Sequence, residues 1–160
     1  MFGLFKKSSK LKVISPVKGD LIPITDVNDD VFSTKMLGDG FAIEPIDGAV
    51  VAPLSGKITT LFPTKHALGI TTDKGLEVLI HMGIDTVELK GAPFDVFVKM
   101  NQEIKAGDKL AQIDLDKIKQ AGLSDTIIVV YTNMDLLNSV SDVDPRPILA
   151  GDVVQEIEYK

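Results

Sequence analysis

The sequence contains no cysteine, and basic residues are scarce relative to acidic ones. The absence of cysteine excludes disulfide bonds, a thiolate nucleophile and a zinc–thiolate site, and it fits a reducing, cytoplasmic location. Lysine and arginine number 17 against 23 aspartates and glutamates, which gives a net charge of −6. Nucleic acid binding depends on clustered basic side chains and is therefore not expected, whereas an acidic surface favours a basic protein partner.

Long apolar runs are also missing, since none approaches the ~18 residues that a membrane-spanning helix needs. The first seven residues are apolar and then basic, Met1-Phe2-Gly3-Leu4-Phe5-Lys6-Lys7. This stretch is too short for a signal peptide, and it fits either a frayed tail or a weak anchor on anionic lipid. We favour the frayed tail, with weak or no membrane contact. A length of 160 residues suits one domain, so we expect a short flexible N-terminal tail over residues 1–12 and a single domain over 13–160.

Several catalytic motifs do not occur in the chain. There is no Gly-x-Ser-x-Gly sequence, which argues against a serine hydrolase. There is no glycine-rich loop ending in Lys-Ser or Lys-Thr, which argues against ATP binding, and no helical metalloprotease signature. The chemistry therefore has to be sought around the two histidines of the chain, His66 and His81.

Turn residues are abundant, with 13 glycines and 8 prolines, and short strand-like runs lie between them. A small-Pro-apolar-polar-Gly signature begins at Ser15 and again at Ala52. The triplet Ala-Gly-Asp followed by a strand-like run occurs at residues 106–108 and 150–152. Such short repeats of strand and turn suggest pseudo-symmetric halves in an all-β fold, an antiparallel β-sandwich or barrel.

The individual elements follow from local patterns. The run Ser124–Thr132 is continuously apolar, which indicates a strand buried on both faces. One or two short helical turns are expected, at Asp29–Leu37 with Asp29 or Asp30 as the cap and at Asp116–Ala121. Gly38-Asp39-Gly40 is expected to form a turn. Further strands are expected within residues 13–24, 41–45, 49–51, 92–98 and 153–157.

Both histidines lie in one predicted β-hairpin. Two apolar runs, Leu68–Thr72 and Leu76–Met82, flank the turn signal Asp73-Lys74-Gly75. The glycine suits the left-handed conformation that closes such a turn, because it has no Cβ. Alternation along the second strand places His81 on the face opposite to its apolar neighbours.

The length of the hairpin loop decides whether the histidines meet. If the loop is the first two turn residues, His66 lies directly opposite His81, with Cβ atoms ~4.5–5.5 Å apart. If it is the last two, the histidines are diagonal neighbours, ~7–8 Å apart. A loop of all three residues pairs His66 with Met82 and turns the histidines apart unless a bulge intervenes. We predict one of the two registers that bring the histidines together.

A single histidine on an apolar strand is most often a packed, hydrogen-bonded residue, but a pair allows phosphoryl chemistry. A neutral imidazole can attack phosphorus, and a second imidazole can donate an N–H to the phosphoryl oxygens. Thr64 precedes His66 by two residues and can hold the other nitrogen of that ring. The alternative is a metal-binding or regulatory protein-interaction module that uses the same histidines, with Asp85 or Asp39 as a third zinc ligand. A ligand supplied by a partner would also complete a zinc site.

Four segments together resemble one protein family: Pro63-Thr64-Lys65-His66-Ala67, the run from His81 to Gly91, Gly38-Asp39-Gly40 and Asn133-Met134-Asp135. Between about Ser15 and Glu158 the chain resembles the glucose-type enzyme IIA of the bacterial phosphoenolpyruvate:sugar phosphotransferase system. The resemblance implies a β-sandwich of duplicated hybrid type, with residues 13–160 forming a single enzyme IIA domain. It also implies a function without a nucleotide or resident cofactor.

The resemblance implies a role for each residue of the histidine pair. His81 would be phosphorylated on Nε2, His66 would stabilise the phosphoryl group, and Thr64 would orient His66. The donor would be phospho-HPr, and the acceptor a cysteine on the IIB domain of a sugar permease.

The same resemblance suggests where partners dock. Asp39 and Asp85 match acids that flank the family's active site and would attract a basic patch on HPr, with solvated turn acids as the alternative. Phe41 and Met82 are candidates for an apolar docking ring, although we prefer a core position for Phe41. Methionine replaces a residue that is often phenylalanine in the family, and its flexible side chain can take that role.

Overall fold

The computed structural model describes residues 9–160, and their secondary structure is dominated by antiparallel strands, which confirms the all-β prediction. The strands are β1 (Lys10–Ile14), β2 (Gly19–Pro23), β3 (Asp39–Pro45), β4 (Ala49–Val51), β5 (Gly56–Leu61), β6 (Ala67–Thr71), β7 (Glu77–Met82), β8 (Phe94–Val96), β9 (Glu103–Ile104), β10 (Lys109–Ile113), β11 (Ile127–Tyr131), β12 (Leu137–Val140), β13 (Arg146–Ile148) and β14 (Val153–Tyr159). The helical turns are η2 (Ile24–Asp26), α1 (Asp30–Ser33), η3 (Thr86–Leu89), α2 (Leu115–Gln120) and η4 (Met134–Leu136).

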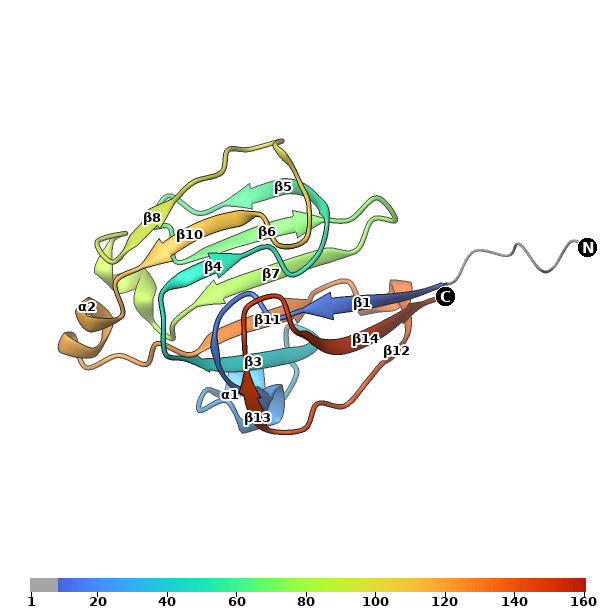
Figure 1. Cartoon of the computed structure of the whole chain (residues 1–160), viewed down its shortest axis with the longest axis horizontal. Coiled ribbons are helices and arrows are strands. Elements are labelled where there is room, and N and C mark those ends of the chain that lie inside the picture. The colour runs from blue at the N-terminus through green and yellow to red at the C-terminus, as the bar shows by residue number, and fades with distance from the viewer. Residues whose placement is uncertain (1–8) are drawn as a thin grey trace, which may run out of the picture.

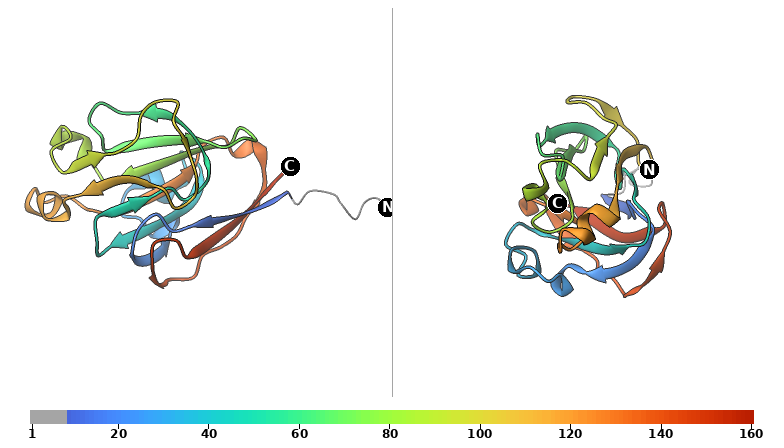
Figure 2. Two further views of the ribbon diagram at one scale, coloured as in Figure 1. Left: turned by 45° about the horizontal axis from the view of Figure 1, so that its top comes forward. Right: turned by 90° about the vertical axis from the view of Figure 1, so that its left-hand side faces the viewer.

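An eight-stranded sheet forms the centre of the fold, in the order β13-β2-β3-β11-β7-β6-β5-β9. Two three-stranded sheets, β1-β14-β12 and β4-β10-β8, complete the structure. Figures 1 and 2 show both small sheets lying on the same side of the large one. Side chains from all three sheets, including Val50, Ile80, Leu110 and Ile157, belong to one buried cluster. The main core therefore lies between the large sheet and the two small ones.

Strand β11 is buried on both faces, as its apolar sequence predicts, and every one of its five residues is buried. Ile127, Val129 and Tyr131 point into the main core. Ile128 and Val130 point to the other face, where they join a second cluster with residues of η2 and α1. The segment around α1 thus covers part of the outer face of the large sheet (Figure 1).

The two repeated signatures occupy equivalent places, which confirms the predicted pseudo-symmetry. The N–H of Ser15 donates to the carbonyl of Asp152 over 2.8 Å, and the N–H of Ala52 donates to the carbonyl of Asp108 over the same distance. The carboxylates of these two aspartates also accept from the backbone three residues earlier, in both cases over 2.8 Å. Each proline segment is therefore bonded to one Ala-Gly-Asp turn by the same pattern.

Strand β1 begins at Lys10, so the prediction that residues 1–12 form a flexible tail is wrong for its last three residues. The strand pairs Lys10 with Glu158 and Lys12 with Glu156 on β14. Lysines thus face glutamates across the pair, and opposite charges in such positions favour pairing. Residues 1–7, for which we favour a frayed tail over a lipid anchor, lie outside the described residues.

The turn predicted at Gly38-Asp39-Gly40 is also corrected, because β3 already begins at Asp39. Asp39 pairs with Tyr131 and Gly40 with Val130 on β11. A Cβ on Gly40 would collide with the carbonyl oxygen of Val129. The glycine therefore permits a close approach of two strands rather than a reversal of the chain. The helical turns predicted near Asp29 and Asp116 are present as α1 and α2.

Candidate functional site

The hairpin that carries the histidines has the register that we did not favour. Strands β6 and β7 pair Thr71 with Glu77 and Ala67 with His81. The turn contains all three residues Asp73-Lys74-Gly75, and the glycine has the expected positive φ of 90°. The prediction of a two-residue loop is therefore wrong, and His66 lies opposite Met82, whose N–H donates to the carbonyl of His66 over 2.7 Å.

The two imidazoles nevertheless lie side by side. Their ring centroids are 5.2 Å apart with an interplanar angle of 72°. His66 lies just before the first residue of β6, and the preceding Lys65 has a left-handed backbone with φ of 59°. This irregular backbone at the strand end frees the His66 side chain from the alternation that would point it to the core.

The orientation of His81 is fixed by its neighbour two residues along the chain. The Nδ1 atom of His81 lies 2.6 Å from the carbonyl oxygen of Gly83. A carbonyl can only accept, so Nδ1 carries the proton and Nε2 keeps its lone pair. The chain turns back at Gly83 with a φ of +87°, a conformation that L side chains rarely adopt. The half-buried His81 therefore presents Nε2 as a nucleophile.

His66 is held in the same manner by Thr64, whose Oγ1 lies 2.6 Å from the Nδ1 of His66. A hydroxyl can donate to Nδ1, and the Nε2 of His66 then carries a proton. That tautomer gives one ring with a free lone pair beside a second ring with an N–H to donate. The sequence-predicted trio of His81, His66 and Thr64 is thus assembled at one place.

Both histidines are held mainly neutral by their surroundings. Burial lowers the pKa of His81, and proximity to His66 lowers it further, while the Gly83 carbonyl and the carboxylates of Asp29 and Asp85 oppose the shift. Burial also lowers the pKa of His66. A neutral imidazole is the form that can act as a nucleophile.

The lowered pKa values predict that acid destabilises the fold. In the unfolded chain the histidines titrate near ~6.5, so between that pH and the folded pKa the unfolded state binds more protons than the folded one. The free energy of unfolding should therefore fall as pH is lowered through this window and level off below the folded pKa. Urea denaturation between pH 5 and 8 (about the histidine range) measures this slope. A His81→Gln variant should show a weaker dependence of the free energy of unfolding on pH. An unchanged dependence would contradict the lowered pKa of His81.

Two aromatic rings that were not predicted as site residues complete the surroundings. The ring of Phe32, from α1, meets the ring of His81 edge-on at 5.2 Å, and Phe62 lies 5.1 Å from His66. Asp29 is the N-cap of α1, where its Oδ1 accepts from Val31 N over 2.9 Å. The sequence identified Asp29 only as a cap, and no local signal connected it with His81.

Asp39 and Met82 are misplaced as docking residues, and Phe41 takes the core position that we preferred for it. Phe41 and Met82 are fully buried in the main core, because their strands direct these side chains between the sheets. Asp39 pairs with Tyr131, whereas His81 pairs with Ile128, which puts Asp39 about 10 Å further along the sheet. The Asp39 carboxylate is instead 3.4 Å from the Nζ of Lys35.

Asp85, by contrast, is exposed and belongs to the histidine site. It has a left-handed backbone with φ of 62° and directly precedes η3. Its carboxylate and that of Asp29 both act on the His81 ring, where they oppose the lowering of the pKa by burial. The acids beside the histidines are therefore Asp29 and Asp85, not Asp39 and Asp85.

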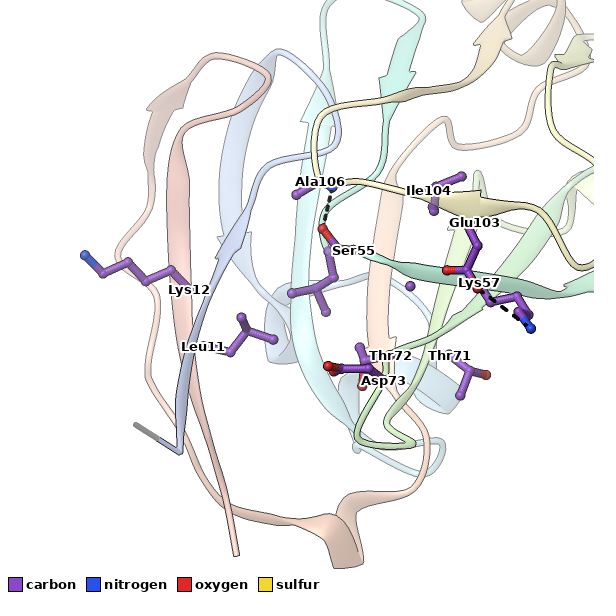
Figure 3. A pocket seen from close by; sticks show the side chains of 12 residues that line it. Leu11, Lys12, Ser55, Lys57, Thr71, Thr72, Asp73, Glu103, Ile104 and Ala106 are labelled. Carbon is purple, nitrogen blue, oxygen red and sulfur yellow. Dashed lines mark hydrogen bonds and ion pairs between the residues drawn. The ribbon is translucent and has the colours of Figure 1, made fainter. Parts of the chain in front are cut away.

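The histidines do not line the groove of about 580 Å³ that lies between β1 and the turn after β6. Its walls carry side chains of both charges, Lys12, Lys57, Asp73 and Glu103 (Figure 3). Lys57 and Glu103 approach one another to 3.7 Å. This groove is at the opposite end of the hairpin from Ala67 and His81.

Residues 9–160 lack two features that would point to other functions. Among residues 9–160, no group of three or more histidine, aspartate and glutamate side chains is arranged to hold a metal ion. A helix with the length and hydropathy needed to cross a bilayer does not occur in this part of the chain.

Sequence comparison relates the chain to a described family. Residues 11–137 match the family profile of the phosphoenolpyruvate-dependent sugar phosphotransferase system, EIIA 1. A "PTS system glucose-specific EIIA component" of Staphylococcus epidermidis is 40% identical over 153 residues, which cover 95% of this chain and 92% of the relative. A "PTS system glucose-specific EIICBA component" of Streptococcus pneumoniae is 46% identical over 147 residues, or 92% of this chain. The chain spans about one fifth of that longer protein, 20% of its length.

A solved structure agrees with these matches. The glucose permease IIA of Mycoplasma capricolum superposes with a TM-score of 0.87 and 43% sequence identity. The superposition covers 95% of this chain and 97% of the other. The antiparallel β-sandwich predicted from the sequence is thereby confirmed as the fold.

Proposed function

The chain belongs to the EIIA 1 family of the phosphoenolpyruvate-dependent sugar phosphotransferase system, and we propose that its phosphoryl group is carried on the Nε2 of His81, taken from phospho-HPr and passed to a IIB domain. The observation that carries this proposal is the bond from the Nδ1 of His81 to the Gly83 carbonyl, beside the imidazole of His66. It leaves Nε2 unprotonated and flanked by a potential donor. The phosphocarrier function follows from the family, and the comparisons do not support the alternative of a metal-binding module.

In the accepting step, the Nε2 lone pair of His81 forms a bond to phosphorus while the donor's P–N bond breaks. The bonding pair of that P–N bond stays on the donor nitrogen. The proton on Nδ1 remains in place, and the Gly83 carbonyl stabilises the positive charge that the phosphorylated ring acquires. We propose that the step uses no nucleotide, metal or other cofactor and that positioning and hydrogen bonds supply the catalysis.

His66 stabilises the transferring group. Its ring lies within reach of a phosphoryl group on His81, and Thr64 Oγ1 at its Nδ1 favours the tautomer with a proton on Nε2. That N–H donates to the phosphoryl oxygens, on which negative charge is spread in the transition state. Thr64 thus orients His66 and does not itself touch the phosphoryl group.

The surroundings of the histidines suit a basic, partly apolar partner. Asp29 and Asp85 provide negative charge, and the exposed side chains of Val31, Phe62 and Val87 provide apolar surface on the segments that flank the histidines. Opposite charge steers a basic partner such as HPr, while apolar contact supports the complex once it forms. These residues replace Asp39, Phe41 and Met82 as our docking candidates.

The acceptor is proposed to be a cysteine of a sugar permease IIB domain. A relative whose name combines components C, B and A supports this pairing, since it joins an A component to a B component. Such a system places the carrier at the cytoplasmic side of a sugar permease. We therefore propose a cytoplasmic location.

The test is the intact mass of the protein after incubation with phosphoenolpyruvate, enzyme I and HPr. A mass increase of one phosphoryl group, removed by mild acid and mapped to His81, is expected because phosphohistidine is acid-labile. Omitting HPr is the control and should leave the mass unchanged. A protein without any added phosphate would reject the proposal, and a phosphate that survives acid would place the modification on a residue other than histidine.

A further inference from the structure

The Gly83 carbonyl that orients His81 is part of a short segment in which every backbone N–H and carbonyl of two consecutive peptide units is hydrogen-bonded. After β7, the peptide unit between Met82 and Gly83 donates its N–H to the carbonyl of Thr126 over 2.9 Å. The next peptide unit donates the N–H of Ile84 to the carbonyl of Ser124 over 3.0 Å, while its own carbonyl, that of Gly83, accepts from His81. The remaining group of these two peptide units is the carbonyl of Met82.

Thr86 donates a hydrogen bond to this carbonyl. Its Oγ1 donates to the carbonyl of Met82 over 2.6 Å, and the residue is completely buried. The left-handed backbone of Asp85 turns the chain so that Thr86, the first residue of η3, lies back over the end of β7. Four hydrogen bonds thus fix two consecutive peptide planes, and one of the four is the bond to His81.

The methyl group of Thr86 adds a steric constraint. A Cβ on Gly83 would collide with the Cγ2 of Thr86 and would come within 3.0 Å of the carbonyl oxygen of Ser124. The Gly83 Cα is therefore confined between η3 and the segment before β11. Thr86 thus bounds this Cα through its methyl group and holds the Met82 carbonyl through its hydroxyl.

The segment on the other side is itself anchored. Thr126 is buried, and its Oγ1 donates to a carboxylate oxygen of Glu44 over 2.7 Å. The hydroxyls of Ser124 and Thr126 lie 2.8 Å apart. The two carbonyls that accept from the N–H groups of Gly83 and Ile84 therefore belong to a segment that is itself held by hydrogen bonds. Thr86 holds the other side of the Met82–Gly83 backbone.

We infer that Thr86 is a positioning residue for phosphoryl transfer, which acts through the Met82 and Gly83 peptide planes to keep the proton of His81 on Nδ1 and the lone pair on Nε2. This inference rests on the proposed function of His81. Thr86 touches neither the imidazole nor the phosphoryl group. Its contribution is to hold the carbonyl that selects the tautomer, as outer partners of functional histidines do.

The test compares Thr86→Val, which removes the hydroxyl and keeps the shape, with Thr86→Ser, which restores the hydroxyl without the methyl. Thr72→Val is the matched control: Thr72 is also buried, and its Oγ1 bonds to Leu76 N and to the hydroxyl of Tyr159, at the far end of the hairpin. Two readouts are needed, the ¹⁵N chemical shifts of the His81 ring, which report the tautomer, and the rate of phosphate uptake from phospho-HPr.

Thr86→Val is expected to shift the His81 ring toward a mixture of tautomers and to slow phosphate uptake by about 10-fold. Thr86→Ser should resemble the parent in both readouts, and Thr72→Val should lower thermal stability without changing the ring. A parent-like ring in Thr86→Val, or an equal change in Thr72→Val, would overturn the inference. If the parent protein takes up no phosphate, the proposed function fails, but the ring shifts still decide whether Thr86 controls the tautomer.

Discussion

A His81→Gln variant is expected to take up no phosphate from phospho-HPr, because the nitrogen of a glutamine amide has no lone pair free for attack on phosphorus. The amide nitrogen of glutamine lies one atom further along the side chain than the Nδ1 of histidine, so the bond to the Gly83 carbonyl is lost. The fold should persist, with a loss of about 1–2 kcal/mol from the altered contacts with Phe32 and Gly83. The measurement is intact mass after incubation with the phosphorylating components.

The control for this experiment is a variant that alters the other histidine. His66→Gln changes an imidazole at the same site but leaves the Nε2 of His81 and its Gly83 bond in place. It should therefore still gain one acid-labile phosphate. Phosphate uptake by His81→Gln at the parent's rate would show that another residue is the nucleophile, and a loss of uptake in both variants with a parent-like melting curve would mean that His66 is needed for acceptance as well.

The contacts within the site that sequence reasoning found are those between residues close in the chain. Thr64 and His66 are two residues apart, and their hydrogen bond follows from that spacing once the side chains share a face. The pairing of His81 and His66 came from the hairpin, which a turn signal between two apolar runs predicts. These are local patterns, and short-range geometry limits them to few outcomes.

The register of the hairpin was not predictable from its turn. Asp73-Lys74-Gly75 fits loops of two or three residues, and the apolar residues on both faces of β6 and β7 do not distinguish one register from the next. The rings meet in the observed register because Lys65 adopts a left-handed backbone. Lysine gives no signal for that conformation, which is more typical of glycine, asparagine and aspartate.

Phe41 and Met82 fail as docking residues because the central sheet is buried on both faces. Phe41 and Phe32 each come soon after an aspartate, so their local sequences look alike. However, β3 directs Phe41 into the main core, whereas α1 places Phe32 over the outer face of the sheet, beside His81. The position of α1 over the sheet brings Asp29 to the site and depends on contacts far apart in the chain. Single-sequence patterns hold no information on that packing.

A His66→Gln variant is expected to accept phosphate but to pass it to the IIB cysteine about 10²–10³-fold more slowly, the loss typical of removing one stabilising group from a transition state. The two steps differ in the charge of the nucleophile. Acceptance uses the neutral imidazole of His81, whereas a cysteine attacks as a thiolate, so two anions approach each other in the donating step. An imidazole beside the phosphoryl group can take up a proton and offset that repulsion, and glutamine cannot.

Glutamine at this position also loses the specific arrangement with Thr64, whose hydroxyl holds the Nδ1 of His66. Single-turnover transfer from the isolated phosphoprotein to a IIB domain measures the donating step separately from acceptance. Thr64→Val is the matched control, since it keeps both imidazoles and removes only the bond that orients His66; it should slow donation by less than His66→Gln does. Donation by His66→Gln at the parent's rate would remove His66 from the mechanism. It would show that the imidazole of His66 does not offset the negative charge of the approaching thiolate.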